Sequence, residues 1–172
     1  MTKTVILTDQ NAAANTSGKT APVSEILSWI SSHFELTVMG DAQMGTALSF
    51  QGCQATLTFA SNSKGTSSGT VVIGTDKNIV GPFDLSNLRP DTIQTGDVET
   101  FNLAVKSVTM LPVTVTQKII GGPFNGTNTS DTNVQNGFVL SFRTKDMRDR
   151  QAKAWHDAII GCGGKAISDK LY

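Results

Sequence analysis

The alternation of apolar and polar residues changes its period between residues 136 and 164. Phe138, Leu140 and Phe142 occupy every second position, which is typical of a strand with one face in a core. After Thr144 the apolar residues recur at steps of three and four, as on one side of an amphipathic helix. They are Met147, Ala154, Trp155, Ala158, Ile159 and Cys162. The pattern predicts a last strand followed by one C-terminal helix.

Both ends of this helix, expected over residues 145–161, carry boundary signals. Thr144 can accept hydrogen bonds from the free amides of the first turn, and Asp146 suits the positive end of the helix dipole. At the other end, Gly161, Gly163 and Gly164 supply a stop, because glycine adopts the left-handed backbone conformation without a clash at Cβ. These signals predict the bounds of the helix as well as its existence.

Shorter alternating patterns predict strands through most of the chain before this helix. Leu57 and Phe59 alternate with threonines in the region 46–61, and the turn-forming cluster 61–69 predicts a hairpin with residues 70–75. Long polar loops are expected at 81–96 and 121–135, with further strands at 78–80, 99–112 and 113–120. The total is six or seven antiparallel strands.

The first 44 residues give weaker patterns. Residues 1–20 are mostly polar and predict a mobile N-terminal arm, in which residues 4–8 either form an edge strand or remain unstructured. Residues 22–31 place apolar side chains at helical spacing behind Pro22, which suits a first helical turn. A helix is favoured there, and a strand is the alternative because bulky residues interrupt the stripe.

Length and charge limit the class of protein. The 172 residues suit one domain. Lysine plus arginine and aspartate plus glutamate both number 14, so the net charge is zero. This balance argues against a nucleic-acid partner, because phosphate binding usually requires a basic excess. No run approaches the roughly 20 apolar residues of a membrane span.

The chain begins without the basic and apolar segments of a secretory signal. We therefore expect a cytoplasmic protein with two free thiols, at Cys53 and Cys162, although the sequence leaves their pairing open.

The residues that usually carry enzyme chemistry are sparse. His33 and His156 are the two histidines, and a thiol–imidazole pair would require Cys53 to approach one of them in space. No cysteine or histidine spacing suits zinc, and no acidic loop suits calcium. Pro123 follows Gly121 and Gly122, so this glycine pair does not open a phosphate-binding helix. We expect a non-catalytic protein without a cofactor or metal, and His156 on a helix surface.

Three segments resemble domains of the pleckstrin-homology-like (PH-like) superfold. Residues 65–80, GTSSGTVVIGTDKNIV, resemble the signature of GRAM and GLUE domains. Residues 99–111 are similar to the next strand of those domains, and 138–160 to their last strand and helix. With ATLTF at 55–59, the resemblance extends over residues 45–162 and is greatest to the GRAM module of the WW-domain-binding protein type. That family's proline-rich PPxY tail is absent from this chain, so the resemblance implies no WW-domain partner.

The resemblance implies a fold and a set of boundaries. The fold is α+β and mostly β: a PH-like, GRAM-type antiparallel barrel or sandwich of six to seven strands, capped by the C-terminal helix. The domain would occupy residues 45–164, with 21–44 as a helical or strand extension and 165–172 as a C-terminal tail. Trp155 would plug the end of the barrel; stacking on a ligand is the alternative.

The function implied is a non-catalytic interaction module that binds a protein partner or a membrane phosphoinositide. Lys64 and Lys77, expected in neighbouring turns, are candidate headgroup ligands together with Lys106 and Lys118 on later strands. The alternative for these four lysines is ordinary solvated surface.

A denser basic strip begins the last helix. Arg143, Arg148 and Arg150 are candidates for binding an acidic partner, and the alternative is a solvent face held by ion pairs with neighbouring aspartates. A second function class is a structural, self-assembling subunit of the virion or tail type. The zero net charge, the Thr-, Ser- and Asn-rich strands and the long polar loops support that class.

Overall fold

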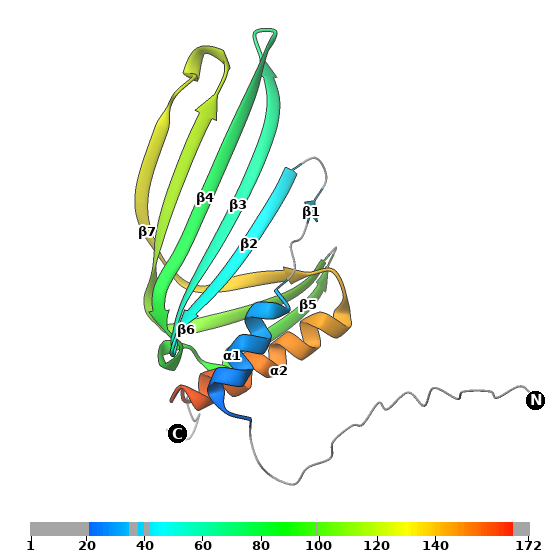
Figure 1. Ribbon diagram of the computed structural model, residues 1–172, viewed down its shortest axis with the longest axis vertical. Helices are drawn as coiled ribbons and strands as arrows, with labels where there is room; N and C mark the ends of the chain where they lie inside the picture. Colours follow the sequence, from blue (N-terminus) through cyan, green and yellow to red (C-terminus); the bar gives the residue numbers. More distant parts are fainter. Residues whose placement is uncertain (1–20, 35–37, 40–41, 99, 167–172) are drawn as a thin grey trace, which may run out of the picture.

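The computed structural model describes residues 21–34, 38–39, 42–98 and 100–166. The predicted arm at residues 1–20 and its edge strand at 4–8 lie outside the described residues, as does most of the tail at 165–172. The described chain forms one antiparallel sheet of seven strands with two α-helices at one end (Figure 1). The elements are α1 (Val23–Ser32), β1 (Val38–Met39), β2 (Ala42–Gln51), β3 (Gln54–Ser67), β4 (Thr70–Asp84), β5 (Gln94–Val98), β6 (Thr100–Ile120), β7 (Asn128–Phe142) and α2 (Lys145–Gly161), with 3-10 turns η1 (Leu85–Asn87), η2 (Pro90–Thr92) and η3 (Gly122–Phe124).

β6 is the central strand, and it changes partners along its length. The strand order is β1-β2-β3-β4-β6-β5, with β7 also paired to β6. Residues 101–104 of β6 lie between β5 and β7, whereas residues 113–118 lie between β4 and β7. The sheet therefore has a base part, built on the first half of β6, and a distal part, in which β3, β4, β6 and β7 extend away from the helices (Figure 1).

A wide bulge in β6 separates the two parts. Lys106 pairs with Gly137 and Leu111 with Gln135, so residues 107–110 face a single residue of β7. An insertion of this kind bends a strand and increases its twist. Gly137 is required here because a Cβ at this position would lie 2.2 Å from the carbonyl oxygen of Val105.

The hydrophobic core fills the angle between the base of the sheet and the two helices. Trp155 on α2 is fully buried, with its ring 5.3 Å from that of Phe138 and 6.0 Å from that of Phe50. Gln151, also fully buried, donates from Nε2 to the carbonyl oxygens of Ile30 and His33 at the end of α1. The other large, fully buried side chains include Ile30, Leu57, Leu85, Leu88, Leu103, Leu111, Leu140 and Ile159.

The predicted helices are confirmed. α1 occupies residues 23–32, and α2 has the predicted bounds of 145–161. The Thr144 hydroxyl accepts the amide of Met147 at 3.2 Å, and Gly163 ends α2 with a φ of 92°. The following amide, that of Gly164, bonds to the carbonyl oxygen of Ile159, as expected for a glycine-terminated helix.

The expected barrel is wrong. The sheet is open, because β7 pairs only with β6 and no described residue of β7 pairs with β1 or β2. Trp155 is buried as expected, but it packs between a helix and an open sheet and does not plug a barrel.

Two of the predicted loops are also wrong. β3 and β4 continue as strands through the predicted turn cluster 61–69, with a tight turn only at Ser68 and Gly69. β7 begins at Asn128, inside the predicted loop 121–135. Ser, Thr and Asn line these strands because neither face of the distal sheet is covered by another element of the described chain, so alternation with apolar residues is not needed there.

The expectation of two free thiols is wrong as well. Cys53, in the β2–β3 turn, forms a disulfide with Cys162, at the end of α2. The two residues are 109 positions apart in the chain, so the bond joins the first hairpin to the last helix. The bond also excludes a thiol–imidazole catalytic pair that uses Cys53.

We predict that losing this disulfide will destabilise the fold strongly. Closing so long a loop restricts the unfolded chain, and this effect is worth about 5 kcal/mol of unfolding free energy. Urea unfolding of the wild type with and without reductant should give this difference, and Cys53→Ala combined with Cys162→Ala should unfold like the reduced wild type. Reactive thiols in the native protein, or equal midpoints with and without reductant, would contradict the bond.

Candidate interaction surface

The distal sheet has two chemically different faces. Successive residues of a strand point to opposite faces, and the strand registers show which residues share each one. Leu57, Val80 and Val113 lie in one cross-strand row and belong to the core, so their face is the inner face, directed toward the helices. The residues between them form the outer face.

Three lysines lie on the outer face. Lys77 of β4 pairs directly with Thr116 of β6, which makes Lys118 its diagonal neighbour, at about 7–8 Å between backbones. Lys64 of β3 lies further along the sheet, opposite Ile73. The cations therefore follow the distal sheet across three adjacent strands.

Apolar side chains accompany these lysines toward the end of the sheet. Lys64, Ile73 and Ile120 occupy one cross-strand row on β3, β4 and β6. Ile73 is 39% exposed and Ile120 46% exposed, and Val71, two residues from Ile73 on the same face, is 50% exposed. We call the lysines Lys64, Lys77 and Lys118 together with Val71, Ile73 and Ile120 the distal patch.

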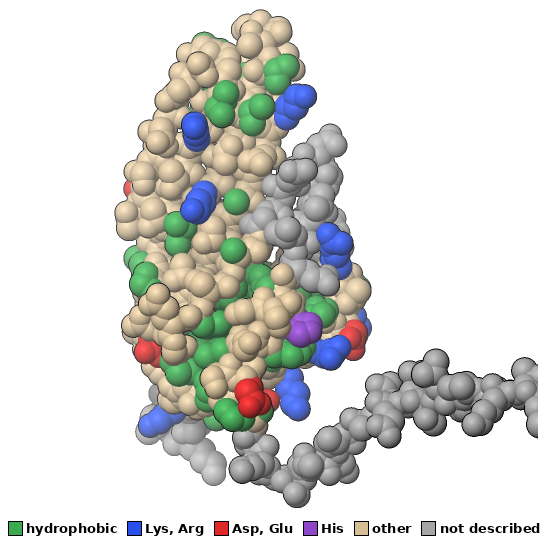
Figure 2. Space-filling view, viewed as in Figure 1, with side chains coloured by type: hydrophobic (Ala, Val, Ile, Leu, Met, Phe, Trp, Pro, Cys, Tyr) green, Lys and Arg blue, Asp and Glu red, His purple; other side chains and the backbone are tan. Residues whose placement is uncertain are grey.

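No carboxylate lies on the outer face within the described residues 58–66, 71–79, 112–120 and 128–134. The two aspartates of this region, Asp76 and Asp131, pair with Gln117 and Val115 and so belong to the inner face. Gln117 donates from Nε2 to Asp76 at 2.9 Å, which holds that carboxylate on the inner side. Figure 2 shows basic and apolar side chains over the distal strands, whereas most acidic side chains in view lie around the helical base.

The predicted lysines thus lie together on one side of the sheet, but their positions differ from the prediction. Lys64 and Lys77 are on strands and not in turns. Lys106 also points away from the core, because its neighbour Val105 is buried, but it lies in the base part beyond the bulge. Lys106 is therefore separate from the distal patch.

Arg148, predicted to bind a partner, is buried within the chain. Its side chain is 3% exposed, and its guanidinium donates to Asp97, to the Gly96 carbonyl oxygen at 3.1 Å and to Asp149 at 2.7 Å. It also lies over the ring of Phe101. Arg148 therefore joins α2 to β5 and has no guanidinium surface to offer a partner.

The charges around Arg148 shift one another's pKa values. Burial alone would lower the pKa of Arg148, but its hydrogen bonds with Asp97 and Asp149 outweigh burial and raise that pKa above its ordinary value. The pKa of Asp149 is lowered, first by a hydrogen bond from Lys145 and then by one from Arg148. Asp149 is thus held in its charged form by two cations.

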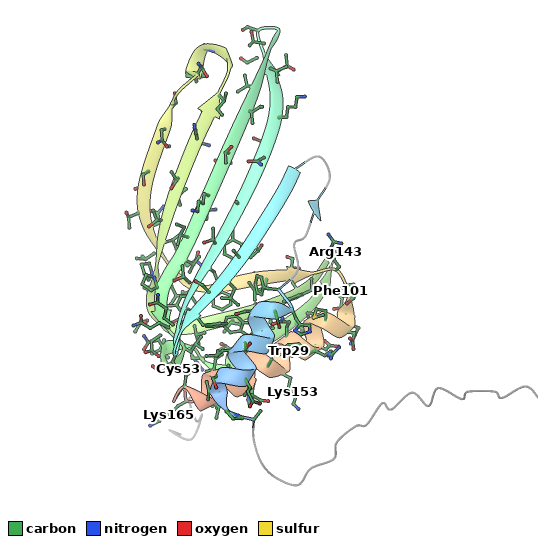
Figure 3. The ribbon with its side chains drawn as sticks, in the orientation of Figure 1. Trp29, Cys53, Phe101, Arg143, Lys153 and Lys165 are labelled. Carbon is green, nitrogen blue, oxygen red and sulfur yellow. A yellow bond between two sulfur atoms is a disulfide. The ribbon has the colours of Figure 1, made fainter. Side chains whose placement is uncertain are left out.

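The other two arginines of the predicted basic strip have surroundings different from those of Arg148. Arg150 pairs with Asp146 at 3.5 Å, and its guanidinium lies over the ring of Trp29 on α1, in a shallow groove of about 420 Å³ between the helices. Arg143 is exposed at the end of β7, near Phe101 (Figure 3). Because Arg148 is buried, the three arginines together do not form the predicted docking strip.

Among the described residues, no group of three or more His, Cys, Asp or Glu is arranged to hold a metal ion. None of the described helices combines the length and the apolar character needed to cross a membrane. The exposed cations and apolar residues of the distal patch are the most distinctive surface feature.

Comparisons with protein-family models, with curated proteins and with solved structures found no match to this chain.

We predict that Asp149 makes stability depend on acid pH. A lowered folded-state pKa means that Asp149 stabilises the fold fully above its ordinary value of 3.8, and that this contribution is lost as the pH falls below that value. Asp149→Asn should therefore lower the melting temperature at pH 6, and its difference from the wild type should shrink below pH 3.8.

Asp146→Asn is the matched control, because Asp146 is on the same helix with its side chain 80% exposed. Melting curves that stay equally far apart for wild type and Asp149→Asn from pH 6 to pH 2.5 would contradict the role of Asp149.

Proposed function

We propose that this protein is a non-catalytic interaction module that holds an anionic membrane surface against the outer face of its distal sheet. The observation that carries the proposal is the distal patch: three lysines and three exposed apolar residues on one face that has no carboxylate among its described residues. Cations attract anionic lipid headgroups, and exposed apolar side chains can enter the boundary between headgroups and acyl chains.

The combination of charge and apolar surface favours a membrane over an acidic protein. Val71, Ile73 and Ile120 are 50%, 39% and 46% exposed, and burying apolar surface in lipid is favourable by about 25 cal/mol per Å². A purely electrostatic partner would leave this apolar area in water.

A phosphoinositide is the lipid that suits the lysine spacing best. Lys77 and Lys118 are diagonal neighbours, so their ammonium groups can reach phosphates of one headgroup. Thr75 and Thr116, their direct cross-strand partners, lie on the same face and add hydroxyl donors. No other element of the described chain covers this face, so a headgroup can approach it from solvent.

We predict that Lys77→Gln combined with Lys118→Gln will weaken binding to vesicles that contain phosphatidylserine and phosphatidylinositol bisphosphate. Each lysine near an anionic surface contributes about 1 kcal/mol, so partitioning should fall roughly 30-fold. Binding of the wild type should also fall as salt rises, because exposed charges are screened. Flotation with vesicles of graded lipid content measures both effects.

The matched control is Lys153→Gln combined with Lys165→Gln, which removes the same charge from exposed positions at the helical base. It should bind like the wild type. Ile73→Thr combined with Ile120→Thr should weaken the binding that persists at high salt. Equal flotation of wild type and Lys77/Lys118 variant, or no flotation of the wild type with anionic vesicles, would overturn the proposal.

A further inference from the structure

β7 forms an open edge of the sheet, on the side away from α1 and α2 (Figure 1). The hydrogen-bonding direction of its residues follows from the turn that precedes it. The amide of Ile119 bonds to the carbonyl oxygen of Thr127, so residues 127, 129, 131, 133 and 135 direct their backbone groups toward β6. Residues 128, 130, 132 and 134 therefore direct their amides and carbonyls outward.

This edge has only one of the usual devices that prevent strands from pairing, the inward-facing charge of Asp131. Monomeric sheet proteins protect their edges with proline, lysine, bulges or very short strands. Residues 128–135 contain no proline and no lysine, their register with β6 is regular, and they span about 27 Å. The one charged residue is Asp131, whose carboxylate accepts the outward amide of Thr132 at 2.8 Å.

Exposed apolar residues lie beside the edge. Val134 of β7 is 61% exposed on the outer face, and Val108 and Met110 in the bulge of β6 are 62% and 57% exposed. The bulge is opposite Asn136 and lies on the β6 side of β7, so of these three residues Val134 is the one on the edge strand itself. Exposed apolar area next to unpaired backbone groups indicates a surface that another chain covers.

We propose that β7 pairs with β7 of a second copy of this chain, antiparallel and around a two-fold axis perpendicular to the sheet. The chemistry of the edge is self-complementary, because the outward residues of both copies are the even-numbered ones and exchange amides and carbonyls with each other. Because the net charge of the chain is zero, overall charge repulsion between two copies does not oppose their association.

The register of this pairing follows from charge and length. A pairing centred on Asp131 would place two carboxylates opposite each other, which is unfavourable. Centring on Thr132 pairs Asp131 with Asn133 of the other copy and uses all of residues 128–136, whereas centring on Ser130 uses only 128–132. Thr132 therefore faces its own counterpart.

Ser130→Pro tests the edge directly. Proline removes an outward amide that β6 does not use, so the monomer should keep its fold while pairing is blocked. Ser130→Ala keeps the amide and is the matched control. In light scattering after size exclusion, the wild type and Ser130→Ala should have twice the mass of the chain, and Ser130→Pro should have the mass of a monomer with an unchanged circular-dichroism spectrum.

Three further variants test the direction and the register. Asp131→Ala frees the Thr132 amide, so dimers should persist at several-fold lower protein concentration than for the wild type. Thr132→Cys should form a disulfide-linked dimer on oxidation, whereas Asn128→Cys should not, because Asn128 would face Asn136 of the other copy.

A monomeric wild type at high concentration, or a dimer that Ser130→Pro leaves intact, would overturn the proposal; the latter result would assign the contact to another surface. The proposal does not depend on membrane binding, since these measurements contain no lipid.

Discussion

The bend in β6 between Lys106 and Leu111 is the constraint on which the rest of the structure depends. The bend divides β6 into two halves. The first half pairs with β5 and the second half pairs with β4. The first half supports a base layer that packs against both helices. The second half carries four long strands beyond the reach of those helices, where both faces of the sheet are left without a covering element of the described chain. The close approach at Gly137 shows that only a residue without a side chain permits this geometry.

The base and the distal sheet are held by different kinds of interaction. The base contains the buried aromatic contacts of Trp155, the ion pairs of Arg148 and the disulfide between Cys53 and Cys162. The distal sheet is held mainly by its backbone ladder and by polar side chains such as Gln117. Because apolar burial stabilises proteins more than exposed polar contacts do, the stability of the protein resides in the base, and the distal sheet is the surface available for partners.

The sequence predicts the parts of this fold that depend on local chemistry. The bounds of α2 follow from Thr144 and Gly163, whose capping roles need no tertiary information. The distal ends of the strands were predicted as loops, because serine, threonine and asparagine are common both in turns and in strands without a buried face. The open sheet, the disulfide and the burial of Arg148 depend on contacts between distant segments, which one sequence does not display. Gln151 was missed for the same reason, although its place on the inner stripe of α2, four residues before Trp155, is a local signal.

The proposed membrane binding and the proposed pairing of β7 with a second copy are geometrically related, because side chains along β7 alternate between the two faces of the sheet. A two-fold axis perpendicular to a sheet leaves each face on its own side, so a β7-paired dimer would display two outer faces together. Its lysines would then form one continuous cationic surface, with Lys118 of each copy one strand away from the shared edge. Two weak attachments held at a fixed separation dissociate far more slowly than one, because the second site remains close when the first releases. In such an assembly, protein concentration would act as a switch for membrane residence through avidity alone.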